Sequence, residues 1–191
     1  MKKIMFNDKY GLTEAVLEGR KTQTRRIVSI HKHIQILIED EPLSDKNKLY
    51  ICEKFSKYKI GEEVAIAQRY SECFRAVCLE NSKGWNNKMF VMAELMPHRI
   101  KITNIRVERL QDISEEDCLK EGVYYHTEPP KHHEYDRYSP WSPSVKPYKF
   151  ESEKYFCSAK YAFKHLIEKV SGKGTWDSNP YVFVYDFELI K

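Results

Sequence analysis

The stretch RIKITNIRVERL, residues 99–110, carries the strongest strand pattern of the chain. Its apolar residues alternate with polar ones, and the phase of this alternation changes by one residue halfway along. A period of two is typical of a strand with one buried face, and a slip of one residue indicates a β-bulge. The stretch therefore predicts a long strand with a bulge near Thr103 and Asn104.

Working outward, the same kinds of local pattern predict the other elements. YVFVYDFELI, residues 181–190, predicts a closing strand whose odd-numbered residues share one face and belong to the core. Further strands are predicted at residues 3–6, at 63–67 after a turn at Gly61, and within KMFVMAEL at 88–95. Helices are predicted at Lys9–Glu18, at 115–121 after the N-cap Ser114, and at Ser152–Val170, each followed closely by a glycine.

This order of elements shows no regular alternation of strand and helix. It favours an α+β domain with a curled sheet over a doubly wound parallel sheet. The 191 residues fit a single domain over residues 1–191. Residues 28–57 are ambiguous, because IHKHIQILIED fits a strand and 42–48 is typical of a loop. Residues 123–150 hold five of the eight prolines and five of the thirteen tyrosines, which predicts a long ordered loop or lid.

The composition limits the class of protein. A net charge of +4 is too small by itself to indicate a nucleic-acid partner. No stretch approaches the roughly 20 apolar residues of a membrane span, so no membrane partner is expected, and the apolar run at residues 4–6 is too short for a signal peptide. The five cysteines include no C-x-x-C pair, which is typical of free thiols in a reducing compartment. We therefore expect a cytoplasmic protein.

Two patterns suggest a metal or a cofactor, and neither is complete. The pairs His31 with His33 and His132 with His133 lack the third and fourth ligands that a zinc site needs. SGKGT, residues 171–175, lacks the upstream glycine of a phosphate-binding loop and the hydroxyl residue after its lysine. We therefore expect neither a metal nor a cofactor.

The segment GRKTQTRR, residues 19–26, concentrates positive charge directly after the first predicted helix. Four of its eight residues are cations and two are threonines. A charge run of this kind is often only a solvated face. Its residue types also fit a phosphate clamp or part of an active site, and the segment alone does not decide between these.

The pattern Gly19-x-Lys21-x-x-Thr24-x-Arg26 resembles the motif of the ASCH family, whose domain resembles the PUA fold. Three further stretches resemble parts of that family in the same order, namely YKIGEEVAIA, VERLQDISEEDCLKEG and NPYVFVYDFELI. The resemblance implies an α+β fold with a small mixed β-barrel and flanking helices. Residues 28–57 and 123–150 would then be insertions. It also implies that the motif lines a cleft, with RNA or a modified nucleoside as the partner.

Some small members of the family are amidohydrolases that remove the acetyl group from N4-acetylcytidine. The resemblance places their catalytic set on Lys21, Thr24 and Glu121. Amide hydrolysis needs a base, a nucleophile and an acid, and these residue types supply them in that order. Lys21 acts as a base only when it is neutral, and burial or the neighbouring arginines would lower its pKa from about 10.4. A plain salt bridge between Lys21 and Glu121 is the structural alternative.

Binding without catalysis is the other interpretation of the same segment. The residues that would contact RNA or a modified nucleoside are Gly19, Arg20, Arg25 and Arg26, with Tyr124 and Tyr125 stacking on bases. A third alternative is a non-catalytic protein-interaction module that acts through residues 123–150. It differs from the other two because Lys21 would have no role in it.

Overall fold

The computed structural model describes residues 1–29, 43–73, 79–125, 148–149 and 156–190. Within these ranges the chain forms an α+β fold around one mixed sheet. Its five strands are β1 (Lys2–Ile4), β2 (Gln23–Ile27), β3 (Glu63–Ile66), β4 (Arg99–Arg109) and β7 (Tyr181–Ile190). The order in the sheet is β1-β3-β4-β7-β2, with β1 and β3 parallel and all other neighbours antiparallel.

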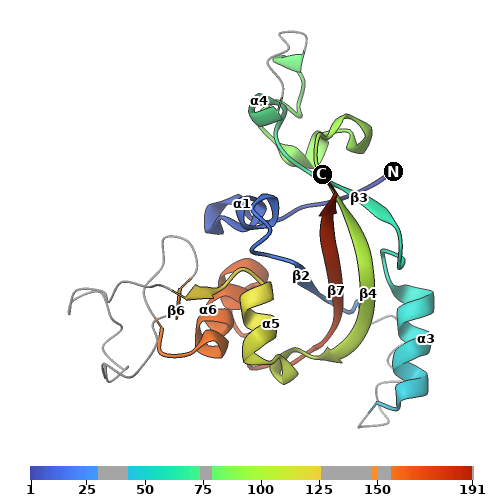
Figure 1. Cartoon of the computed structure of the whole chain (residues 1–191), viewed down its shortest axis with the longest axis vertical. Coiled ribbons are helices and arrows are strands. Elements are labelled where there is room, and N and C mark those ends of the chain that lie inside the picture. The colour runs from blue at the N-terminus through green and yellow to red at the C-terminus, as the bar shows by residue number, and fades with distance from the viewer. Residues whose placement is uncertain (30–42, 74–78, 126–147, 150–155, 191) are drawn as a thin grey trace, which may run out of the picture.

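The long strands β4 and β7 form the centre of the sheet and curve together through the molecule (Figure 1). Their register shifts between Ile102 and Asn104, which confirms the predicted bulge. The predicted turn at Gly61 is also present, and the Gly61 N–H donates to the Ile102 carbonyl at 2.7 Å. Tyr181 and Tyr185 of β7 are buried, as the closing-strand pattern predicts.

Helices and short 3₁₀ turns cover the sheet. The helices are α1 (Leu12–Leu17), α3 (Asp45–Phe55), α4 (Tyr70–Cys73), α5 (Glu115–Lys120) and α6 (Ala159–Ser171). The 3₁₀ turns are η1 (Asp8–Tyr10), η3 (Lys88–Phe90), η4 (Ala93–Leu95) and η5 (Leu110–Asp112), and β5 (Tyr124–Tyr125) pairs with β6 (Tyr148–Lys149) in a separate small sheet. Figure 1 shows α5 and α6 together on one side of the central strands and α3 on the other. None of the described helices is long and apolar enough to cross a bilayer.

The predicted strand in KMFVMAEL is wrong, because this stretch forms the turns η3 and η4. The Asn87 side chain accepts the Met89 N–H at 2.9 Å and so starts the first turn. Lys3 Nζ donates to the carbonyls of Met89 and Val91 at 2.7 and 2.6 Å. Side-chain contacts therefore satisfy backbone groups that a neighbouring strand would otherwise pair.

Two predicted helices have different bounds. The first is interrupted at Gly11, whose φ of +61° separates η1 from α1. The last begins at Ala159, later than the predicted Ser152, and the Ser158 hydroxyl caps it by accepting the Tyr161 N–H at 3.1 Å. The helix α5 has the predicted cap, because the Ser114 side chain accepts the Asp117 N–H at 3.1 Å.

Local patterns do not predict α3 or β2. α3 begins at Asp45, inside the range expected to be a loop, and it buries only Ile51 fully, so its apolar stripe is weak. β2 buries the polar residues Gln23, Thr24 and Arg25, so it shows no apolar alternation. The strand interpretation of residues 30–40, the lid prediction for 126–147 and the four histidines named above lie outside the described residues.

Side chains connect the two edges of the sheet. Among the described residues no backbone pairing joins the edge strands β1 and β2, so the sheet is open. Arg26 Nη2 of β2 donates to the Met5 carbonyl, just after β1, at 2.7 Å. The Tyr58 hydroxyl donates to the Lys3 carbonyl of β1 at 3.1 Å. The sheet thus curls far enough for one arginine to bridge its edges, and a cavity of about 420 Å³ lies between them.

Candidate functional site

The segment 19–26 leaves α1 in a tight turn and continues as β2. Gly19 adopts a φ of +76°, a conformation that glycine reaches without a Cβ clash. The Lys21 N–H donates to the Ala15 carbonyl at 2.8 Å, and the Thr22 N–H donates to the Lys120 carbonyl at 3.0 Å. The second bond ties the segment to the end of α5. It brings Lys21 beside Glu121, which lies 100 residues later in the chain.

Lys21 and Glu121 form a buried ion pair. Lys21 Nζ donates to Glu121 Oε2 at 2.6 Å and to the Glu121 backbone carbonyl at 2.8 Å. The two side chains are only 2% and 6% exposed. The salt bridge named above as the structural alternative is therefore present. Because water screens it so little, each charge depends on its partner far more than in a surface pair.

Burial lowers the pKa of Lys21 below its ordinary value, although the Glu121 carboxylate beside it raises that pKa. The positive charges of Arg26 and Arg25 add to the lowering. The direction and these causes agree with the prediction from the sequence. Arg20 does not contribute, because its guanidinium lies near the surface at 2.6 Å from the Glu18 carboxylate. Deprotonation to the neutral amine, which a base requires, therefore costs less free energy at Lys21 than at an exposed lysine.

Lys21, Thr24 and Glu121 line one cavity of about 270 Å³, here called the deep pocket. Its walls are largely apolar and include Phe6, Leu12, Phe163, Leu166 and Ile167. Thr24 is buried, and among the described residues Lys21 Nζ hydrogen-bonds Glu121 rather than the Thr24 hydroxyl. A volume just below the 300–1,000 Å³ typical of drug-sized sites suits one ring-sized group.

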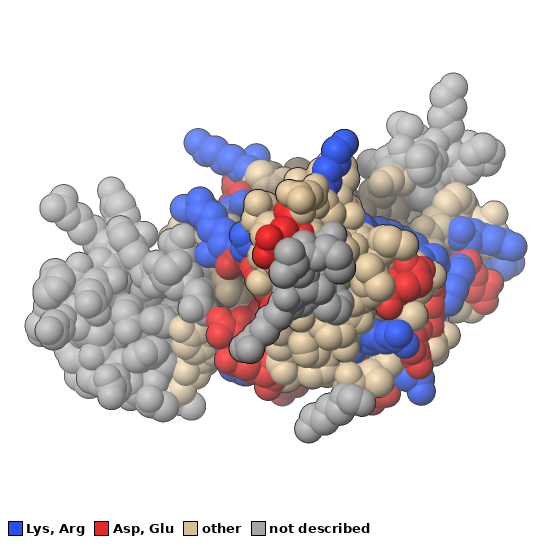
Figure 2. Space-filling view, turned by 90° about the horizontal axis from the view of Figure 1, so that it is seen from above, with Lys and Arg blue, Asp and Glu red and all other residues tan. Residues whose placement is uncertain are grey.

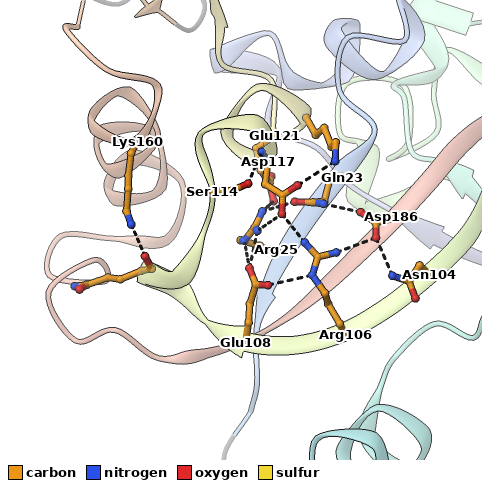
Figure 3. Close-up of polar contacts among 12 residues, drawn as sticks. Gln23, Arg25, Asn104, Arg106, Glu108, Ser114, Asp117, Glu121, Lys160 and Asp186 are labelled. Carbon is orange, nitrogen blue, oxygen red and sulfur yellow. Dashed lines mark hydrogen bonds and ion pairs between the residues drawn. The ribbon is translucent and has the colours of Figure 1, made fainter. Parts of the chain in front are cut away.

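On the other side of Glu121, Arg25 lies in a network of carboxylates (Figure 3). Arg25 Nη1 donates to Glu121 Oε1 at 3.0 Å, while Nη2 donates to Glu108 Oε1 at 2.6 Å and to Asp117 Oδ2 at 3.2 Å. Its side chain is 1% exposed. Burial opposes the charge, but Glu121 and Glu108 outweigh it and raise the pKa of Arg25. The guanidinium therefore stays charged and fixes the Glu121 oxygen that faces away from Lys21.

A second arginine extends this network. Arg106 donates to Glu108, Asp117 and Asp186 at 3.0, 2.5 and 2.9 Å. The Gln23 amide donates to Asp186 at 2.5 Å, and its carbonyl accepts from Arg25. We call the set the carboxylate cage, and its members are Gln23, Arg25, Arg106, Glu108, Asp117, Glu121 and Asp186. They come from β2, β4, β7 and α5 with its C-cap residue Glu121, and no spacing in the sequence shows that these separate elements meet (Figure 3).

The predicted binding residues fall into two classes. Lys21 and Arg25 are buried against carboxylates, so neither presents an open face to a phosphate. The Arg20 side chain is 37% exposed and Arg26 is half-buried. The Arg20 guanidinium lies 5.4 Å from the centre of the Tyr124 ring, and Tyr125 is exposed. Basic and acidic side chains are interspersed over the face of the molecule in Figure 2. The described part of this face therefore has no extended positive patch for a nucleic acid.

The described residues contain no group of histidine, cysteine or carboxylate side chains placed to hold a metal ion. Cys118 on α5 is buried, and burial raises the pKa of its thiol to about 12. A thiol of that pKa makes a poor nucleophile near neutral pH. Among the described residues that line the deep pocket, Lys21, Thr24 and Glu121 are the groups that fit a base, a nucleophile and an acid, and Asn7, Arg25, Arg26 and Ser171 are its other polar members.

Comparison of the chain with protein-family models, with curated proteins and with solved structures gives no match in any of the three. The ASCH resemblance therefore remains a prediction that rests on the motif and on the order of the surrounding elements.

Proposed function

We propose that this protein is an ASCH-type amidohydrolase that binds an acylated nucleoside, such as N4-acetylcytidine, in the deep pocket and removes its acyl group. The observation that carries the proposal is the convergence of the buried residues Lys21, Thr24 and Glu121 on one largely apolar pocket. These are the residues that the motif resemblance implies, and Glu121 comes from a part of the chain far from the other two. A plain salt bridge accounts for Lys21 and Glu121, but it gives no reason for Thr24 to line the same cavity.

The open, curled sheet supports the finer fold proposal, a PUA-like barrel. A barrel needs its two edge strands to approach each other. Arg26 reaches from β2 to the carbonyl of Met5, just after β1. We propose that this side chain replaces part of the backbone pairing that would close the barrel, leaving a cleft beside the motif.

In the proposed reaction the Thr24 hydroxyl oxygen attacks the amide carbonyl of the acyl group, and neutral Lys21 takes the hydroxyl proton. Glu121, in its protonated form, gives a proton to the departing exocyclic N4 nitrogen as the C–N bond breaks. The acyl group is then held as an ester on Thr24. Water attacks that ester, releasing the carboxylic acid and restoring the hydroxyl.

A single proton transfer within the Lys21–Glu121 pair would produce both the base and the acid of this reaction. Moving that proton along the 2.6 Å contact from Nζ to Oε2 leaves a neutral amine and a neutral carboxylic acid, which are the base and the acid that the reaction needs. Burial favours this neutral form because it removes two charges from a site with little water. Arg25 favours the charged form through Glu121, so the cage sets how far the pair departs from full ionisation.

The test is chromatography of N4-acetylcytidine after incubation with wild-type protein, Lys21→Ala and Thr24→Ala. Cytidine should form with wild type and at a rate reduced by at least about 10²-fold in each variant. Arg20→Ala is the matched control, because it removes a cation of the same segment that does not line the deep pocket. Lys21→Ala leaves Glu121 paired with Arg25, so circular dichroism should show a folded protein. Full turnover by Lys21→Ala would contradict the proposal.

RNA binding is the second candidate, and the exposed position of Arg20 over the Tyr124 ring favours it. If Arg20 and Arg26 alone contact phosphates, the slope of log affinity against log salt should be about −1.4 for single-stranded RNA, since each neutralised phosphate contributes roughly −0.7. Phosphate contacts by all four cations of the segment would instead give a slope of roughly −3. Fluorescence anisotropy at several salt concentrations separates these cases, and affinity that does not change with salt would exclude this candidate.

A further inference from the structure

A second hollow opens directly beside the deep pocket. It has a volume of about 510 Å³, and the residues that line both cavities are Met5, Phe6, Asn7, Arg26 and Val170. The rest of its lining comes from η1, from Arg69 before α4, and from the segment 86–88 that leads into η3. A ligand with its ring in the deep pocket would therefore have this hollow directly beside it, with only these five residues shared between the two.

The hollow carries an excess of positive charge. Its lining includes four cations, Lys9, Arg26, Arg69 and Lys88, and one carboxylate, Asp8. Asp8 is shared by Lys88 at 2.7 Å and Arg69 at 3.8 Å, and the Glu72 carboxylate also pairs with Arg69 at 2.8 Å. Within the described residues neither Lys9 nor Arg26 forms an ion pair. This arrangement differs from the carboxylate cage, where each arginine contacts several carboxylates.

Side-chain amides add hydrogen-bond donors to the same hollow. Asn7 Oδ1 accepts the Lys9 N–H at 3.0 Å, and Asn87 Oδ1 accepts the Met89 N–H at 2.9 Å. These two bonds use the acceptor oxygens of the amides, so the groups that remain for a ligand are the NH₂ donors. Asn86 supplies a third amide to the lining. Donors and cations thus outnumber acceptors, which is the balance that an anionic ligand requires.

We propose that this hollow binds the phosphate of a nucleotide whose base occupies the deep pocket. The inference rests on the proposed function for the base, and it narrows the substrate from a nucleoside to a phosphate-bearing nucleotide. A phosphate has several acceptor oxygens and no donor when fully ionised, so it matches amide NH₂ groups and unpaired cations. The same chemistry is offered by a free mononucleotide and by a nucleotide within a strand.

The test compares two ligands that the proposed reaction cannot consume, cytidine and cytidine 5′-monophosphate, by isothermal titration calorimetry. Wild type should bind the monophosphate at least about tenfold more tightly than cytidine, since a few charge-assisted hydrogen bonds give at least that factor. The double variant Lys9→Ala/Arg69→Ala should lose this preference. The matched control, Lys101→Ala/Lys164→Ala, removes the same charge from residues outside the hollow and should keep it. Lys88 is left unchanged because it also holds the Asp8 and Thr13 side chains.

Equal affinities for the two ligands in wild type would overturn the phosphate subsite, and so would a preference that survives in the Lys9/Arg69 variant. If N4-acetylcytidine is hydrolysed while the affinities are equal, the proposed function stands and the subsite fails. Inorganic phosphate tests the subsite alone. It should shift the NMR signals of the Asn7, Asn86 and Asn87 amides in wild type and not in the double variant, even if cytidine does not bind and the proposed function fails.

The two sources of phosphate are separated by a trinucleotide with a central cytidine. A strand substrate predicts tighter binding of the trinucleotide than of the monophosphate, with both weakened in the Lys9/Arg69 variant. A free nucleotide predicts that the monophosphate binds at least as tightly as the trinucleotide. Trinucleotide binding that is unchanged in the variant would overturn the proposal.

Discussion

Arg25 and Arg26 are neighbours in β2, yet they have opposite environments. Arg25 points into the carboxylate cage, where Glu108, Asp117 and Glu121 surround its guanidinium. Both arginines contribute to the lining of the deep pocket, but only Arg26 also lines the adjacent hollow, and it donates to a backbone carbonyl. Successive residues of a strand face opposite sides, so two identical side chains meet different partners. Formal charge in a sequence therefore does not show whether that charge is available to a ligand.

Of the substitutions considered for these two arginines, we expect the larger loss of stability from the one at Arg25. Arg25→Ala would remove the buried cation that Glu108, Asp117 and Glu121 share, leaving only Lys21, Arg106 and Lys120 beside them, and the free energy of unfolding should fall by about 3–5 kcal/mol. Arg26→Ala removes one hydrogen bond to a carbonyl and should cost about 0.5–1.5 kcal/mol. Urea denaturation of both variants measures the difference. Similar losses for the two variants would show that the ion pairs of Arg25 stabilise the fold no more than one hydrogen bond to a carbonyl does.

A second pair of variants, at two glycines with positive φ, tests the packing between the carboxylate cage and the deep pocket. Gly122 follows Glu121 with a φ of +101°, and a Cβ there would lie 3.1 Å from Leu12 Cδ2 and 3.6 Å from Lys21 Cδ. Gly19 also has a positive φ, of +76°, but a Cβ there would meet nothing within 4 Å. Gly122→Ala should therefore cost up to about 3 kcal/mol, and Gly19→Ala only about 1 kcal/mol. Equal unfolding midpoints in urea would mean that the packing of Leu12 and Lys21 against Gly122 has no energetic weight.

The pKa of Lys21 tests how the cage acts on the pocket. Glu121 raises that pKa through its charge and its hydrogen bond, so Glu121→Gln should lower it further below the ordinary 10.5. The pKa is measured by an NMR titration of the labelled lysine side chain, with Lys21→Ala identifying the signal. A pKa that stays the same or rises in Glu121→Gln would show that the carboxylate does not stabilise the charged amine.

The lowered pKa of Lys21 also determines whether the free energy of unfolding rises or falls with pH. Because the pKa of Lys21 is lower in the folded than in the unfolded chain, the folded state binds fewer protons between the two values. Stability should therefore increase as pH rises through that interval, and the full cost of burying the charged amine applies below it. Lys21→Ala should lack this contribution when unfolding is followed by urea titration at several pH values.

The sequence predicts those parts of the molecule that local patterns determine. The bulge in β4 follows from an alternation that slips by one residue, and the start of α5 follows from a serine cap before three acids. β2 is missed because its buried residues are polar, and polar burial is decided by partners on other strands. α3 is missed because its single fully buried residue, Ile51, gives no apolar stripe to detect.

The site divides in the same way. The pairing of Lys21 with Glu121 is predicted because the family resemblance places both residues in one site. The spacing of 100 residues along the chain does not by itself bring them together. The cage around Arg25 is not foreseen, since Glu108, Asp117 and Asp186 come from three separate elements. The sequence also does not show which cations of the hollow, such as Lys9, form no ion pair within the described residues. Their availability depends on the absence of a carboxylate nearby in space, which no pattern along the described chain reports.

The smallest effect on stability is expected at Arg20, where the charge run has its most exposed member. Its ion pair with Glu18 is largely in water, and such pairs contribute less than about 1 kcal/mol. Arg20→Ala should therefore leave the urea midpoint within that margin of wild type. We propose a second role for Arg20 in RNA binding, because an arginine over an aromatic ring, here that of Tyr124, offers a flat surface for a base. If that role holds, Arg20→Ala weakens binding of single-stranded RNA while stability is kept, whereas Arg25→Ala loses stability first. A variant that loses both together would place Arg20 with the structural cations and not with those available to a ligand.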